Sequence, residues 1–251
     1  MCDVVVVIPA RYGSTRLPGK PLLDLEGAPI LARVLEQLHA LAPIPLLVAT
    51  DHEQIARVAR EYGALPLMTP PDCPTGLDRV AAAVASRSED IVVNVQGDEP
   101  FVDPAAVKKL ISTMREAPDL PMATLAAPVS DLESYRSPDC VKVVLSAGSR
   151  ALYFSRHPIP WSDSDTGVPH GALKHLGVYA YRKATLRALA EQGPARIERQ
   201  ERLEQLRALH LGVPIQVLRV DRAWIGVDTP RDLERARRHW RVRHPTAEGA
   251  A

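Results

Sequence analysis

Apolar residues along the chain fall into two alternating patterns. Residues 4–8 form a continuous β-branched run that stops at Pro9, which is typical of a strand buried on both faces of a parallel sheet. In residues 30–41 the apolar positions recur every three or four residues, which predicts an amphipathic helix, and residues 46–49 return to the strand pattern. This alternation continues to residue 114 and predicts an α/β fold with a mostly parallel sheet covered by helices.

The pattern changes beyond Met122, where strand-like runs follow one another without long helices between them. These runs are residues 122–126, 141–145, 152–155 and 176–181. They predict a β-rich insertion at roughly 122–182 within a single domain that spans 1–244. Later elements are predicted at 183–190 (helix), 197–210 (helix), 215–220 (strand) and from Pro230 onward (helix). We expect the tail, residues 245–251, to be flexible.

Composition places the chain among ordinary globular proteins. Of its 251 residues, 46% are hydrophobic and 24% are charged, so a stable core needs no disulfide or metal. Lysine and arginine number 31 against 30 acidic residues, for a formal net charge of +1. Such a balance argues against a dedicated nucleic-acid or membrane-surface binding protein. Any anion-binding site must therefore be local.

The cysteines and the apolar segments indicate in which cellular compartment the protein is found. Cys2, Cys73 and Cys140 are far apart in sequence, which suggests neither a zinc site nor a disulfide framework and favours a reducing, cytoplasmic environment. The apolar run at 4–8 is too short for a signal peptide and is preceded by Asp3, where a positive charge belongs. No apolar stretch approaches the length that spans a bilayer, so we expect no membrane association.

A polar loop at residues 9–21 directly follows the first predicted strand. In open α/β sheets ligands bind at the carboxyl ends of strands, where this loop lies. It holds two glycines and three cations, Arg11, Arg16 and Lys20. Backbone N–H groups near glycine and cationic side chains suit a polyphosphate, although a solvated connection is the alternative. The loop is not a standard P-loop, because Pro21 stands where a magnesium-binding hydroxyl belongs, and the chain has no G-x-G-x-x-G fingerprint.

Two aspartates are left over once helix capping is accounted for. Asp98 follows the strand predicted at 91–95, and Asp103 is already placed to cap the helix that begins at Pro104. Asp228 precedes Thr229, which with Asp232 forms a capping box for the last helix. Carboxylates combined with phosphate oxygens suit Mg²⁺, so Asp98 and Asp228 are a candidate metal pair. On spacing alone, Asp228 could equally be a surface turn residue.

Thr75 and Asp78 form a second capping box, which accounts for Asp78 but not for the adjacent Arg79. Taken together, these motifs resemble those of one family. The sequence IPARYGSTRLPGKPL at 8–22 is similar to the signature loop of 3-deoxy-manno-octulosonate (Kdo) cytidylyltransferases. The resemblance continues through VQGDEP at 95–100, VKVV at 141–144, ALYFSR at 151–156, HLGVYAYR at 175–182, LEQLR at 203–207 and GVDT at 226–229. It covers nearly the whole chain.

The resemblance implies a Rossmann-like three-layer α/β/α nucleotidyltransferase fold. It also implies transfer of CMP from CTP to the anomeric hydroxyl of a 2-keto-3-deoxy sugar acid, Kdo, with release of pyrophosphate, for lipopolysaccharide biosynthesis. The implied cofactor is Mg²⁺, and the implied assembly is a homodimer in which the β-rich insertion takes part.

By the same resemblance, each motif carries a role. The implied catalytic residues are Arg11, Lys20, Asp98 and Asp228, of which Asp98 and Asp228 would hold the metal. The implied nucleotide-binding residues are Pro9, Ala10, Arg11, Gly13, Ser14, Lys20, Thr75, Arg79, Gln96 and Asp98. The implied sugar-binding residues are Arg156, His175, Tyr179, Glu204 and Gln205.

The chain departs from the family pattern at a few positions, which keep alternatives open. Leu77 replaces a hydroxyl residue in the segment 75–79, and this motivates the alternative of a nucleotide-binding module that has lost catalysis. Asp139, Cys140 and Lys174 differ from the common residues and allow another sugar acid, such as 8-amino-Kdo. A sialic-type nonulosonate is a further alternative acceptor, whereas a dinucleotide-dependent oxidoreductase is disfavoured by the missing glycine fingerprint.

Overall fold

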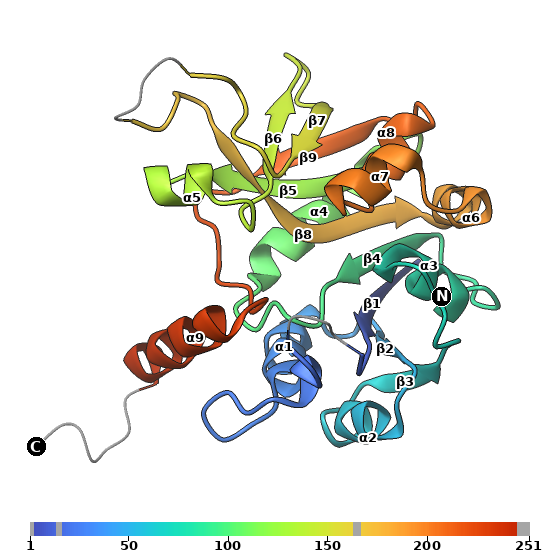
Figure 1. Ribbon diagram of the computed structural model, residues 1–251. Helices are drawn as coiled ribbons and strands as arrows, with labels where there is room; N and C mark the ends of the chain where they lie inside the picture. Colours follow the sequence, from blue (N-terminus) through green and yellow to red (C-terminus); the bar gives the residue numbers. More distant parts are fainter. Residues whose placement is uncertain (1–2, 14–16, 163–166, 245–251) are drawn as a thin grey trace, which may run out of the picture.

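The computed structural model describes residues 3–13, 17–162 and 167–244 (Figure 1). Nine strands in this part of the chain form one sheet. The strands are β1 (Val4–Ala10), β2 (Leu46–Thr50), β3 (Leu65–Met68), β4 (Ile91–Val95), β5 (Met122–Pro128), β6 (Lys142–Leu145), β7 (Ala151–Ser155), β8 (Leu173–Arg182) and β9 (Ile215–Arg219). The main path of the sheet has the order β3-β2-β1-β4-β8-β5-β9.

Strand directions confirm the prediction of a mostly parallel sheet. The neighbours on the main path are parallel from β3 to β4 and again at β5 and β9. Only β8 on this path is reversed, running antiparallel to both β4 and β5. Because β8 runs the other way, the residues that precede Val178, the partner of Val95, extend past the carboxyl end of β4.

Helices cover both faces of the sheet (Figure 1). The α-helices are α1 (Ile30–Leu38), α2 (Glu53–Glu61), α3 (Gly76–Ala83), α4 (Pro104–Glu116), α5 (Leu132–Arg136), α6 (Lys183–Gln192), α7 (Arg196–Glu201), α8 (Leu206–His210) and α9 (Pro230–Arg243), and the short 3-10 helices are η1 (Lys20–Leu22) and η2 (His39–Leu41). Alternate residues of β1 point to opposite layers: Val4 and Val6 pack with α1, α2 and α4, whereas Val5 and Val7 pack with α3, α6 and α8. The three-layer α/β/α arrangement is thus confirmed.

Residues 122–182 contain the four strands β5, β6, β7 and β8, as their apolar runs predict. Two of these, β5 and β8, lie within the main path of the sheet between β4 and β9. The β6–β7 pair lies off this path and joins the sheet through β8. The β-rich segment therefore completes the central sheet and adds a hairpin at one end of it (Figure 1). The expected flexible tail lies outside the described residues.

The single helix predicted at 197–210 is wrong, because the structure has two short helices there. Arg202 adopts a left-handed conformation with φ of 55° and ends α7, and its backbone N–H donates to the Glu198 carbonyl. Helix α8 begins only at Leu206. The break turns the segment 203–205 toward the carboxyl edge of the sheet, which a continuous helix would not do.

The last helix, α9, packs against the start of α1 and the loop after β4. Leu233, Ala236 and Trp240 form a small apolar cluster with Leu25 and Phe101, among others. This docking carries the segment that precedes α9 to the carboxyl edge of the sheet. Among the described residues, no helix combines the length and the apolar character needed to cross a membrane.

Candidate active site

The loops that follow β1 and β4 meet at the carboxyl edge of the sheet, because these strands are parallel neighbours. Gly97 permits their close approach: a Cβ at this position would lie 3.1 Å from the Pro9 carbonyl oxygen, which is tighter than nine in ten Cβ contacts in proteins. The loop 96–100 thereby packs against the end of β1, at the edge where open α/β sheets bind ligands.

Lys20 joins two carboxylates at this edge. Its Nζ lies 2.5 Å from Asp98 Oδ2 and 2.9 Å from Asp228 Oδ1. Burial alone would lower the pKa of Lys20, but the charges of Asp98 and Asp228 outweigh burial and raise this pKa above its ordinary value. The ammonium group therefore stays charged and bridges the two carboxylates, which lie far apart in the sequence.

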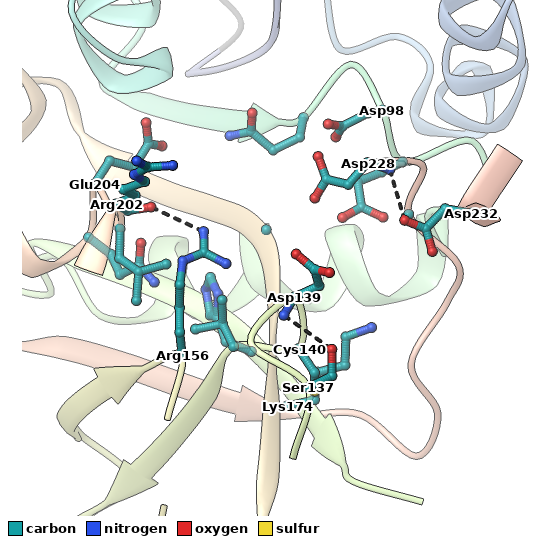
Figure 2. Close-up of a pocket in the computed structure, with 18 of the residues that line it drawn as sticks. Asp98, Ser137, Asp139, Cys140, Arg156, Lys174, Arg202, Glu204, Asp228 and Asp232 are labelled. Carbon is teal, nitrogen blue, oxygen red and sulfur yellow. Dashed lines mark hydrogen bonds between the residues drawn. The ribbon is translucent and has the colours of Figure 1, made fainter. Parts of the chain in front are cut away.

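The capping predictions explain why both aspartates face Lys20. Asp103 accepts the Ala105 N–H and caps α4, while Thr229 and Asp232 form the complete capping box of α9. Asp98 and Asp228 are not needed as caps and point into the site (Figure 2). Burial raises the pKa of Asp98, an effect that Lys20 opposes and Asp228 reinforces.

Glu99 is a buried carboxyl group beside this pair. Burial and then the charge of Asp98 raise the pKa of Glu99 to about 8. Gly226 makes room for it, since a Cβ there would lie 3.1 Å from Glu99 Oε2. The structure places Glu99 in the wall of the site.

Two connected cavities open at this edge. The smaller has a volume of about 350 Å³ and lies between the loop 9–21 and the start of α3. Its predicted residues are Pro9, Ala10, Arg11, Lys20, Thr75, Arg79, Gln96, Asp98 and Asp228. The larger has a volume of about 1200 Å³ and extends toward β8 and α7. Its predicted residues are Arg11, Thr75, Gln96, Asp98, Arg156, His175, Tyr179, Glu204, Gln205 and Asp228.

Within the smaller cavity, Arg79 is anchored rather than free. Its Nη1 donates to Thr69 Oγ1 at 2.6 Å and its Nη2 donates to Asp51 Oδ2 at 3.1 Å. Asp51 also accepts the Tyr12 N–H at 3.2 Å. Arg79 therefore holds α3 and the loop 9–21 in a fixed relation, which the sequence did not indicate.

In the larger cavity, His175, Tyr179 and Gln205 form a buried polar wall. The Thr124 hydroxyl donates to the Val178 carbonyl at 2.7 Å, so it accepts from His175 Nε2, 2.9 Å away. Tyr179 donates its hydroxyl to Gln205 Oε1 at 3.0 Å. Burial lowers the pKa of His175 to about 3, so the imidazole is neutral.

Arg156 is held in place by main-chain carbonyl groups. It donates to the Glu201 carbonyl at 2.8 Å, to the Pro138 carbonyl at 2.8 Å and to the Arg202 carbonyl at 3.4 Å. These bonds tie the loop before β6 to the turn between α7 and α8 and leave only part of the guanidinium for a ligand (Figure 2).

The Leu77 departure does not face the cavities. Its side chain is fully buried in the core, and only its N–H reaches the site, donating to Glu204 Oε2 at 2.9 Å. Burial raises the pKa of Glu204 to about 7, an effect that this bond opposes. Leu77 therefore gives no support to the alternative of a module without catalysis. The other departures, Asp139, Cys140 and Lys174, do line the larger cavity (Figure 2).

Two of the predicted nucleotide-binding residues are not seen to line a cavity. Gly13 lines neither cavity, and Ser14 lies outside the described residues. Conversely, Arg202 lines both cavities although no motif pointed to it. Its position depends on the break between α7 and α8, which helical periodicity hides.

A hard cation could be held by Asp98 and Asp228. No group of three or more histidine, cysteine, aspartate or glutamate side chains in residues 3–13, 17–162 and 167–244 could hold a metal ion. Two carboxylates that need further oxygen ligands from a substrate are, however, the donor set that Mg²⁺ uses with nucleotides. The residues present thus fit magnesium bound together with a phosphate ligand.

Comparison with known proteins gives one consistent family. Residues 5–215 match the cytidylyltransferase family. A 3-deoxy-manno-octulosonate cytidylyltransferase of Bdellovibrio bacteriovorus is 47% identical over 236 residues, 92% of this chain and 95% of the relative. That of Halorhodospira halophila is 48% identical over 240 residues, 91% of this chain and 93% of the relative.

A solved structure is similar at the level of the whole fold. It is a CMP:2-keto-3-deoxy-manno-octonic acid synthetase complexed with CTP, with a TM-score of 0.86 and 39% identity, and the match covers 96% of this chain and 99% of that chain. Sequence and fold therefore agree across nearly the full length: the chain belongs to the cytidylyltransferase family and, within it, to the 3-deoxy-manno-octulosonate cytidylyltransferases.

Proposed function

We propose that the protein transfers CMP from CTP to the anomeric hydroxyl of Kdo and releases pyrophosphate. The observation that carries this proposal is the Lys20, Asp98 and Asp228 cluster at the junction of the two cavities. Asp98 and Asp228 line both cavities, so a group bound between them touches the occupants of both. A nucleotide in the smaller cavity and an acceptor in the larger one would meet there.

The chemistry requires alignment and charge neutralisation. The acceptor hydroxyl attacks the α-phosphorus in line with the departing pyrophosphate, and negative charge is spread over the phosphate oxygens. Lys20 and Arg11 supply positive charge on the side of the triphosphate. Arg79, through Asp51 and the Tyr12 N–H, keeps the loop that carries them in register with α3.

Asp98 and Asp228 would hold Mg²⁺ once the nucleotide supplies phosphate oxygens. When bound, the ion would neutralise charge on the α-phosphate and acidify the attacking hydroxyl. Lys20 holds the two carboxylates close together before the substrates arrive. This matters because two adjacent carboxylates without a cation would repel each other.

The acceptor would lie along the polar wall of the larger cavity. His175, Tyr179 and Gln205 offer neutral donors and acceptors for hydroxyl groups of a sugar, Glu204 offers carboxyl oxygens, and Arg156 retains some donors for an anionic group. A cytoplasmic homodimer that serves lipopolysaccharide biosynthesis is part of the same proposal, and the family resemblance supports it.

The proposal predicts pyrophosphate release from CTP and Mg²⁺ with Kdo, tested in parallel with 8-amino-Kdo and a sialic acid. Turnover with Kdo should fall on the order of 100-fold or more in both Asp98→Asn and Asp228→Asn, since each substitution removes one metal-binding charge. Asp103→Asn is the matched control, because asparagine caps a helix about as well as aspartate, and it should keep full activity.

Each other result would point elsewhere. Turnover with 8-amino-Kdo alone would show that the acceptor is an amino sugar. Its selection would then be attributed to the departures from the family pattern that line the larger cavity, Asp139, Cys140 and Lys174. If no pyrophosphate is released with any of the three sugars, in a protein that still binds CTP, the result would contradict the proposed reaction and favour a nucleotide-binding module.

A further inference from the structure

Arg202 combines an unusual backbone with an unusual position. Its φ of 55° lies in the left-handed region, which costs a residue with a Cβ on the order of 1 kcal/mol or more. The conformation ends α7 and lets the Arg202 carbonyl accept from Arg156 Nη2 at 3.4 Å. Glycine would adopt this conformation without strain, so the arginine side chain is retained where the backbone disfavours it.

The side chain of Arg202 lies where the two cavities join. It lines the smaller cavity together with Arg11 and Lys20, and the larger one together with Arg156 and Glu204. Figure 2 shows Arg202 with Arg156 and Glu204 on the side of the cavity opposite Asp98 and Asp228. The cation thus faces the metal-binding carboxylates across the place where the reaction occurs.

Arg202 shares with Arg11 an uncommitted guanidinium, whereas the other arginines near the site are committed to protein groups. Arg79 is paired with Asp51, and Arg156 donates to three main-chain carbonyl groups. In the described part of the chain, no hydrogen bond or ion pair is formed by the Arg202 side chain, which is exposed. Its five N–H donors are therefore available to a ligand.

A 2-keto sugar acid places an anion at that junction. Its carboxylate is attached to the same carbon that carries the attacking anomeric hydroxyl, so it must lie within a few ångströms of the α-phosphorus during transfer. A planar guanidinium can bind both carboxylate oxygens at once. We propose that Arg202 binds the carboxylate of the acceptor and so favours 2-keto sugar acids over neutral sugars at this site.

This inference rests on the proposed function, but it makes a separate claim. The triphosphate is the other anion that could reach Arg202. Arg11 and Lys20 already serve the nucleotide side, whereas the partly committed Arg156 leaves the acceptor without a full guanidinium fork. The acceptor carboxylate is therefore the better match, and a contact with the triphosphate becomes an outcome that the experiment separates.

The test compares Arg202→Gly, Arg202→Lys and the control Arg196→Ala, which removes an exposed arginine of α7 that lines neither cavity. Pyrophosphate release is measured with Kdo varied at saturating CTP, and with CTP varied at saturating Kdo. We expect Arg202→Gly to lower kcat/KM for Kdo about 10- to 100-fold, the effect of losing a charged hydrogen-bonded pair. The KM for CTP should change less than about twofold.

Two further readouts separate ligand binding from a structural role. Arg202→Gly should unfold at the same or a higher temperature than the wild type, because glycine relieves the left-handed strain. Arg202→Lys should recover only part of the loss, since lysine keeps the charge but not the fork. The wild type should be much less active with the uncharged C1 amide of Kdo than with Kdo itself. Arg202→Gly, which is already impaired with Kdo, should be only slightly less active with the amide, because the effects of removing two directly interacting groups do not add.

The outcomes are distinguishable. If the wild type turns over no Kdo, the proposed function fails first. If the wild type is active and Arg202→Gly keeps its kcat/KM for Kdo, the carboxylate assignment is wrong while the reaction stands. A rise in the KM for CTP without a change for Kdo would likewise overturn it and assign Arg202 to the triphosphate.

Discussion

Lys20 illustrates how a single side chain organises the site. Its ammonium group is the only cation within hydrogen-bond distance of both Asp98 and Asp228 among the interactions of the described residues. It places a positive charge between two carboxylates, which would otherwise repel each other at this distance. The same arrangement leaves those carboxylates ready for a metal ion.

Replacing Lys20 with methionine should destabilise the metal-free protein by about 1–3 kcal/mol, because two neighbouring carboxylates then lose the ammonium group that lies between them. Millimolar Mg²⁺ should restore much of this loss, so the unfolding temperature of Lys20→Met should rise more with Mg²⁺ than that of the wild type. Lys109→Met, on the exposed face of α4, is the control and should behave as the wild type. An equal Mg²⁺ response in all three proteins would argue against Asp98 and Asp228 as the metal pair.

At the scale of elements, one buried arginine connects the two sides of the site. Arg207 of α8 is fully buried and pairs with Asp78 of α3 at 2.6 Å and with Glu198 of α7 at 2.8 Å. Asp78 also belongs to the capping box with Thr75 at the start of α3. Helices α3, α7 and α8, which lie beside the two cavities, are thereby held by one ionic network.

Arg207→Met should lower the free energy of unfolding by about 3–5 kcal/mol, because it leaves two carboxylates buried without their cation. Arg187→Met removes an exposed pair with Glu191 on α6 and should cost less than about 1 kcal/mol. Denaturant titrations of both variants measure the two costs. Similar values for the two arginines would show that the network contributes no more than a surface ion pair.

At the scale of the whole molecule, the active-site edge is assembled from distant segments. Lys20 and Asp228 are 208 residues apart in sequence, yet their side chains are in contact, because α9 returns to pack against Leu25 and Phe101. The net charge of +1 leaves little overall repulsion near neutral pH. The pH dependence of stability should therefore reflect a few buried groups.

His175 should make the protein less stable in mild acid. Burial lowers its pKa from 6.5 to about 3, so below pH 6.5 the unfolded chain binds a proton at this position that the folded protein does not. The His175 contribution to stability is retained above pH 6.5 and is lost as the pH falls, by about 2 kcal/mol at pH 5. Glu99 and Glu204 act in the opposite direction, because their raised pKa values make the folded protein bind protons before the unfolded chain does. Denaturant titrations from pH 5 to pH 8 should therefore show His175→Gln gaining stability relative to the wild type as the pH falls, by about 2 kcal/mol at pH 5, and no such gain for His210→Gln, an exposed control. The same slope in His175→Gln would exclude this histidine as the cause.

Local sequence patterns predicted much of this architecture. The continuous apolar run of β1 indicates burial on both faces, and the capping boxes at Thr75 and Thr229 are both present. Counting the caps was informative because it left Asp98 and Asp228 without a structural task. These features depend on residues that are neighbours in sequence, so the sequence alone reports them.

The sequence by itself therefore determined the α/β class, the buried core strands, the capped helix starts at Thr75, Asp103 and Thr229, and the two aspartates that no helix uses as a cap, because each depends on local periodicity or capping. Only the tertiary structure decided the reversed direction of β8, the buried position of Leu77, the anchoring of Arg79 and Arg156, and the place of Arg202 between the cavities. These depend on which distant segments pack together, and a strand direction or a left-handed residue leaves no periodic signal. The candidate site is a property of that packing.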